Sequence, residues 1–175
     1  MTFFACHPEQ REGSLPETFL HHKSITLGEV IVKTVPSFKL SQEGCDLIVN
    51  AAIEKAKELK QIVSICVVDA GGHLMAFKRM TNGRTHNTLI AQTKARSAAL
   101  TTATTGKVGR DGSEIPDHQV LAQTLAVGPG WFISIEGGIP INVDGQCIGA
   151  IGVSGAPSAV DRQIGQAGID TFNRA

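Results

Sequence analysis

A glycine-rich stretch, residues 137–155, constrains the fold of this chain more than any other part of its sequence. Residues 139–143 are rich in β-branched side chains, which is typical of a strand. Asp144-Gly145 then predicts a type I′ turn, because both residues tolerate the positive φ that this turn requires. Residues 146–153 predict the returning strand, so the stretch as a whole predicts a β-hairpin.

Two glycines in the returning strand, Gly149 and Gly152, leave bare backbone on a sheet face. Glycine weakens a strand and usually marks a bulge, a bend or the close approach of another group. That group could be a helix, a second subunit or a ligand. Residues 85–102 are rich in alanine and predict a helix with small side chains. We therefore interpret the two glycines mainly as a packing site for that helix.

The hydrophobic periodicity of the remaining sequence predicts further helices and strands. Ser41 is a good N-cap for the first of these helices. In chain order we expect a short strand or extended arm at 25–34, a helix at 41–59, a hairpin at 61–80, the Ala-rich helix at 85–102, a loop at 103–119, a short helix at 120–126, a strand at 131–135, the glycine-rich hairpin, and a last helix capped by Ser158 with Asp161 three residues later.

This order predicts an α+β fold, an α/β sandwich in which helices flank an antiparallel sheet of about five strands. The short turns between strands argue against a parallel, doubly wound sheet. The sequence has no GxGxxG motif after a predicted strand and no Walker A loop. The usual glycine-based nucleotide sites are therefore not supported.

Length and charge limit the class of protein. The chain has 175 residues, with 16 Lys and Arg against 16 Asp and Glu, so its formal net charge is +0. We expect one domain over residues 24–175, preceded by an irregular extension at 1–23. Without a basic excess, neither nucleic acid nor a membrane is an expected partner. Near-zero charge weakly favours an oligomer.

The cysteines and the apolar segments bear on location. The cysteines are widely scattered and show no CxxC spacing, which suits a reducing compartment and argues against a structural zinc site. We recognise neither a secretory signal nor an apolar run long enough to span a bilayer. A cytoplasmic location is therefore expected.

Three motifs in this chain are similar to those of a known family. They are Val-Val-Asp-Ala-Gly-Gly-His-Leu-Met-Ala-Phe-Lys-Arg-Met at 67–80, Ala-Gln-Thr-Lys-Ala at 91–95, and Gly-Gly-Ile-Pro-Ile followed by Ile-Gly-Ala-Ile-Gly-Val-Ser-Gly within 137–155. Their order resembles the GlcG/HbpS-like family over roughly residues 35–173. The resemblance implies a profilin-like sandwich, a homo-oligomer from dimer to octamer and, in some members, haem binding.

The resemblance leaves the ligand open. In the family that the chain resembles, the axial ligand of haem-binding members is a residue of the first helix or another residue at the surface. The helix predicted at 41–59 contains no His, Met or Tyr. Extracellular members carry an export signal, which we do not recognise here. Haem is therefore a candidate cofactor, another small-molecule ligand is the alternative, and no other cofactor is implied.

Three basic side chains are candidate ligand-binding residues. His73 follows a Gly-Gly turn at a sheet rim, where it could bind a ligand or hydrogen-bond to the turn backbone. His86 begins the Ala-rich helix, where free N–H groups and the helix dipole attract carboxylates, although it could also serve as a cap. Lys94 falls near the buried side of that helix, where a lysine needs a partner.

The entrance to the closing hairpin is a second candidate region. Gly137 and Gly138 form a ligand-accessible bend directly after Glu136, where the hairpin meets the 103–119 loop. Glu136 could act there as a catalytic base, and His118 could close over the same pocket as an acid or base. The alternatives are a carboxylate bonded to neighbouring N–H groups and a solvated loop histidine. No HExxH-like pair occurs, so no metal site is expected.

Three functions remain open at this point. The family resemblance narrowly favours a small cytosolic, oligomeric binding protein for haem or another small ligand. The second is an enzyme of small organic acid catabolism, such as a lyase, hydratase or isomerase, with acid–base chemistry near Glu136 and the 103–119 loop. The third is a structural or interaction subunit without pocket chemistry.

Overall fold

Four antiparallel strands form one sheet in the part of the chain that the structure describes, residues 33–109 and 111–175. In this computed structural model the strands are β1 (Ser64–Asp69), β2 (Leu74–Arg79), β3 (Gly138–Val143) and β4 (Gln146–Ser154), in the spatial order β2-β1-β4-β3. Both predicted hairpins are confirmed, as β1–β2 and β3–β4. The pairing of β1 with β4 joins the two hairpins into one sheet.

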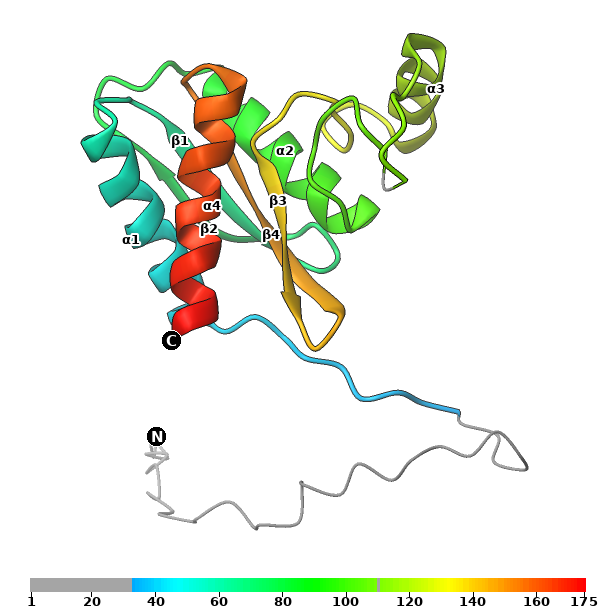
Figure 1. Cartoon of the computed structure of the whole chain (residues 1–175), viewed down its shortest axis with the longest axis horizontal. Helices are drawn as coiled ribbons and strands as arrows, with labels where there is room; N and C mark the ends of the chain where they lie inside the picture. The colour runs from blue at the N-terminus through cyan, green and yellow to red at the C-terminus, as the bar shows by residue number, and fades with distance from the viewer. Residues whose placement is uncertain (1–32, 110) are drawn as a thin grey trace, which may run out of the picture. The chain divides into compact units, whose positions relative to one another are not determined.

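Helices cover both faces of the sheet, which confirms the predicted α+β sandwich (Figure 1). The helices α1 (Gln42–Glu58) and α4 (Ser158–Arg174) lie side by side on one face, and α2 (Asn87–Thr101) covers the other. Successive side chains of a strand point to opposite faces. Accordingly, Ile65 and Val67 pack in the core under α1 and α4, whereas Cys66 and Val68 pack against the alanines of α2.

The close approach of α2 to the sheet occurs at Gly152. A Cβ at this position would overlap the carbonyl oxygen of Ala91 and lie 2.5 Å from the backbone nitrogen of Ala95. The helix backbone therefore rests directly on the strand backbone, as the sequence predicted. The packing interpretation is wrong for Gly149, since a Cβ there would overlap the carbonyl oxygen of Val68 on the neighbouring strand β1 and would not meet α2.

The predicted fifth strand at 131–135 is wrong, since the sheet has four strands within the described residues. The segment instead runs along α2. Ser97 Oγ lies 3.2 Å from the carbonyl oxygen of Ile133, to which it donates, and 3.4 Å from the Ile133 N–H, from which it accepts. The Arg96 guanidinium lies 4.8 Å from the centroid of the Trp131 ring. The apolar pattern thus reflects partial burial against a helix and not strand pairing.

One of the two predicted helix caps is confirmed. Ser41 Oγ accepts a hydrogen bond of 3.1 Å from the Gly44 N–H at the start of α1. The predicted cap of α4 is wrong: Ser158 is already helical, and Pro157 holds the cap position without a side-chain hydrogen bond. Asp161 is instead drawn into the interior by Lys94.

The short helix predicted at 120–126 is confirmed as α3 (Asp117–Val127), and none of its residues is buried. The compact unit begins at Pro36. The extension predicted at 1–23 lies outside the described residues, as does most of the arm predicted at 25–34. Among the helices of the described segments, none is long and apolar enough to cross a membrane.

Candidate functional site

A groove of about 280 Å³ lies where α2 and α4 both begin, next to the end of β4. Its lining comes from three stretches of the chain, 84–94, 135 and 154–161, that the fold brings together. The lining residues are Arg84, His86, Asn87, Ile90, Lys94, Ile135, Ser154, Gly155, Ala156, Ser158 and Asp161. Two helix N-termini therefore border one small space, and helix N-termini favour negatively charged groups.

The floor of the groove is a buried ion pair. Lys94 Nζ lies 2.8 Å from Asp161 Oδ2, and each side chain is only 2% exposed. Lys94 also donates a 2.8 Å hydrogen bond to the carbonyl oxygen of Val153. The other carboxylate oxygen of Asp161 accepts from the Ala156 N–H at 2.9 Å. These contacts supply the partner that Lys94 was predicted to need, and they join α2, β4 and α4 at one point.

Burial and charge act in opposite directions on Asp161. Removal from water raises the pKa of this carboxyl above its ordinary value, while the hydrogen bonds from Lys94 and from the Ala156 N–H act to lower it. The net shift of the pKa is upward. The Lys94 ammonium therefore offsets part of the effect of burial, and its loss would raise the pKa of Asp161 further.

Gly137 makes room for this pair. Its φ of +120° is one that side chains rarely allow, and a Cβ there would lie 2.9 Å from Lys94 Nζ and 3.0 Å from Asp161 Cβ. A Cβ on the adjacent Gly138 would overlap the Lys94 carbonyl oxygen. The two glycines thus lie behind the floor of the groove, where they admit the ion pair, and they are not among the lining residues.

Arg84 and His86 form the rim of the groove, and both side chains are exposed. His86 occupies the N-cap position of α2 without making a cap hydrogen bond, so the cap interpretation is wrong. Its imidazole remains available to a ligand. Ile90 and Ile135 add apolar surface beside these two basic groups.

Two further polar residues reach the groove from the buried side. Asn87 is 7% exposed and Ser154 is 5% exposed, and both belong to the lining. The sequence interpretation missed both residues and treated Asp161 only as a helix cap. The available signal was position: Asn87 opens an apolar helix, and Ser154 ends an apolar strand.

The other predicted site residues lie elsewhere. His73 is exposed at the β1–β2 turn, with Nδ1 3.3 Å from Asp69 Oδ1. His118 is exposed on α3, and Glu136 has its nearest cation, Arg162, at 4.0 Å. Neither Glu136 nor His118 lines any of the three cavities found in the described part of the chain. Glu136 meets the 103–119 loop, since its Cγ would lie 3.5 Å from a Cβ at Gly106, but the predicted catalytic pair shares none of these cavities.

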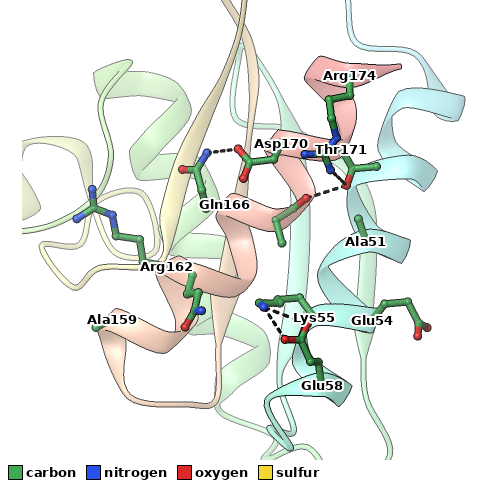
Figure 2. A pocket seen from close by; sticks show the side chains of 12 residues that line it. Ala51, Glu54, Lys55, Glu58, Ala159, Arg162, Gln166, Asp170, Thr171 and Arg174 are labelled. Atoms are coloured by element: carbon green, nitrogen blue, oxygen red, sulfur yellow. Dashed lines mark hydrogen bonds and ion pairs between the residues drawn. The ribbon is translucent and has the colours of Figure 1, made fainter.

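A larger groove of about 790 Å³ lies between α1 and α4 (Figure 2). Its polar side chains are mostly satisfied within their own helices, as Figure 2 shows for the pairs Lys55–Glu58, Gln166–Asp170 and Arg174–Thr171. A third cavity of about 470 Å³ lies under the 103–115 segment beside α3. Among residues 33–109 and 111–175, no three His, Cys, Asp or Glu side chains are grouped as metal ligands.

The helix-flanked antiparallel sheet and its basic groove define a small α+β sandwich protein with one candidate binding site. The family described as "Haem degrading protein HbpS-like" matches residues 40–170. Protein GlcG of Escherichia coli K12 is 40% identical over 116 residues, which are 66% of this chain and 81% of GlcG. The chain belongs to the HbpS-like family, as the sequence motifs predicted.

Solved structures agree with this assignment. Protein ORFY of Klebsiella pneumoniae matches with a TM-score of 0.71 and 26% identity, covering 84% of this chain and 99% of ORFY. The structure described as a PduOC–heme complex matches with a TM-score of 0.67 and 27% identity, covering 78% of this chain and 96% of that one. The matches therefore extend over nearly the whole length of both solved chains.

Proposed function

We propose that this chain is a ligand-binding protein whose ligand is haem, held at the groove where α2 and α4 begin. The family and the haem complex of a solved relative support the choice of ligand. The observation that carries the choice of site is the His86 imidazole. It is exposed, makes no cap hydrogen bond, and lies with Arg84 on the rim of a groove floored by a buried ammonium.

The residues of the groove fit the chemistry of haem. Imidazole is a common axial ligand of haem iron, and His86 would serve that role. The Arg84 guanidinium would pair with a propionate, because guanidinium and carboxylate match in charge and geometry. Ile90 and Ile135 would lie against the apolar macrocycle. When bound, haem supplies a redox-active iron centre.

The size of the groove limits how haem would be held. Its volume of about 280 Å³ lies just below the range of roughly 300–1,000 Å³ that is typical of small-molecule pockets. One chain would therefore enclose only an edge of the macrocycle. The remaining surface of the ligand would face solvent or a second copy of the chain.

Titration with hemin tests this proposal. We expect the Soret band to shift on binding, and His86→Ala to weaken binding by about tenfold or more, because an iron ligand is lost. His73→Ala and His118→Ala are matched controls, since both histidines are also exposed and lie outside the groove. A shift that depends on either control residue would contradict the site, and the absence of any shift would contradict the ligand.

A homo-oligomer is part of the proposal. The helix α3 buries none of its residues in the chain, and Leu121 and Leu125 are 60% and 73% exposed. An isolated helix of 11 residues is marginally stable in water, so packing must support it. We propose that a second copy covers α3. The number of subunits and the cytoplasmic location stay predictions from the sequence.

The alternative enzymatic function has no specific support from the geometry. Its proposed acid and base, Glu136 and His118, share no cavity among those found in residues 33–109 and 111–175. The enzymatic function would gain support if the purified protein converted a small organic acid and if Glu136→Gln and His118→Ala each abolished this turnover.

A further inference from the structure

We propose that the inner half of the groove is a carboxylate-binding subsite formed by Asn87, Ser154 and Lys94. The inference deepens the proposed function, because it names the chemical group that the same groove recognises. It rests on groups of this chain whose hydrogen-bonding capacity is not used within the described residues.

Asn87 and Ser154 are the first part of the argument. Both residues are more than nine-tenths buried, and neither the amide of Asn87 nor the hydroxyl of Ser154 has a hydrogen-bond partner among the described residues. These polar groups are not fully enclosed, because the enclosed unpaired side-chain atoms are Ser64 Oγ and Gln123 Oε1, so they are open to the groove. Both side chains line the groove, so a molecule in the groove is the available partner.

Other buried hydroxyls show the usual behaviour. Ser97 bonds to the Ile133 backbone, and Thr105 Oγ1 accepts from the Gly138 N–H at 2.8 Å. Ser64 Oγ and Gln123 Oε1 are enclosed and unpaired; Ser64 lines none of the three cavities, and Gln123 lines the cavity beside α3. The groove differs because the polar groups of Asn87 and Ser154 border one open space.

Lys94 supplies the third donor. An ammonium group has three N–H bonds, and two of them are used by Asp161 and by the Val153 carbonyl oxygen. The third has no acceptor among the described residues, and Lys94 lines the groove although its side chain is only 2% exposed. The start of α4 adds to this, because Ser158 borders the groove and the helix has no side-chain cap. Uncapped N–H groups at a helix start attract anions.

The charge balance favours a carboxylate over a doubly charged anion. Asp161 neutralises Lys94, which leaves the Arg84 guanidinium as a positive charge of the groove that no carboxylate of the described residues pairs with. One positive charge matches one carboxylate. A carboxylate also offers two oxygens with several lone pairs, which suits a donor set of an amide, a hydroxyl and an ammonium. Its source is either a propionate of haem or a free small carboxylic acid.

Binding of propionate, followed by amide chemical shifts or calorimetry, tests the subsite. We expect the wild-type chain to bind propionate, and Asn87→Leu and Ser154→Ala each to weaken binding about tenfold or more, since each removes a hydrogen bond to a charged group. Asn50→Ala is the matched control, because Asn50 is exposed on α1, away from the groove. Thermal unfolding establishes that each variant is folded before its binding is compared.

Two further experiments distinguish a haem propionate from a free carboxylic acid, and the failure of the subsite from the failure of haem as the ligand. Hemin and its dimethyl ester are compared in wild type and in Ser154→Ala; a loss for hemin alone identifies the propionate as the source. Propionate binding without hemin binding would sustain the subsite and overturn haem as the ligand. If hemin binds equally to wild type, Asn87→Leu and Ser154→Ala, and propionate does not bind, the subsite is overturned and haem stands as the ligand. Equal binding of inorganic phosphate, unaffected by Asn87→Leu, would also overturn it.

Discussion

At some positions a glycine allows two backbone segments to touch, and a larger side chain there would push them apart. At Gly152 the backbones of β4 and α2 touch, and a methyl group there would overlap the carbonyl oxygen of Ala91. A methyl group at this position cannot be accommodated by a rotamer change, because the atoms that it meets belong to the backbone. The helix or the strand would have to move.

We therefore predict that Gly152→Ala destabilises the fold by about 3 kcal/mol, the upper part of the usual range for overpacking. Gly145→Ala is the control, since a Cβ there meets open space and costs only the strain of its φ of +78°. That strain is of order 1–2 kcal/mol. Urea unfolding measures both changes. Equal costs for the two variants would show that α2 does not rest on Gly152.

At the scale of the elements, the Lys94–Asp161 pair joins α2 to α4 beside the carboxyl end of β4. Removing one member of a buried pair leaves an uncompensated charge, at a cost of about 3–5 kcal/mol. We predict this loss for Lys94→Met, measured by urea unfolding at pH 7. The double variant Lys94→Met with Asp161→Asn should recover most of it, because no buried charge remains. A double variant as unstable as the single one would contradict this.

The same pair predicts a dependence on pH. Burial raises the pKa of Asp161, so the folded chain holds this proton more tightly than the unfolded chain does. The resulting contribution to stability is fully present below the ordinary pKa of an aspartate and is lost as the pH rises through the folded-state value. Lys94→Met raises that value further. Its deficit in unfolding free energy relative to wild type should therefore be smaller at pH 5 than at pH 7, and an equal deficit would contradict the shift.

The sequence predicted elements better than it predicted contacts between them. Residues 41–59, both hairpins and the Ala-rich helix follow local periodicity, and all were confirmed. The strand at 131–135 failed because partial burial against a helix produces the same apolar pattern as strand pairing. The pattern specifies which residues avoid water and does not specify the neighbour that covers them.

The candidate site was predictable only in part for the same reason. His86 and Lys94 were found because a helix start and a buried lysine each carry a local physical signal. Asn87 and Ser154 are 67 positions apart in the sequence, and only the packing of α2 on β4 places them at one groove. Glu136 lies against Gly106 of the 103–119 loop, as expected, but neither Glu136 nor His118 lines one of the three cavities, so their catalytic roles stay predictions.

At the scale of the whole molecule, α3 is the one described helix that buries none of its residues. We predict that the protein is oligomeric in solution. The double variant Leu121→Glu with Leu125→Glu should lower the mass of the assembly, because charges would replace the exposed apolar side chains of this helix. Light scattering coupled to size exclusion measures the mass. Val35→Glu is a control with an equally exposed apolar residue outside α3. An unchanged mass in the α3 variant would show that α3 is not the interface.

The stacking of Arg96 on Trp131 has a practical consequence, because the chain contains 1 tryptophan. All indole emission therefore comes from the segment that leads into β3, at a point where it touches α2. The groove residues His86, Asn87 and Lys94 belong to the same helix or its first turn. Intrinsic fluorescence thus offers an optical reporter on the helix that carries the groove, without any label and with a single emitter.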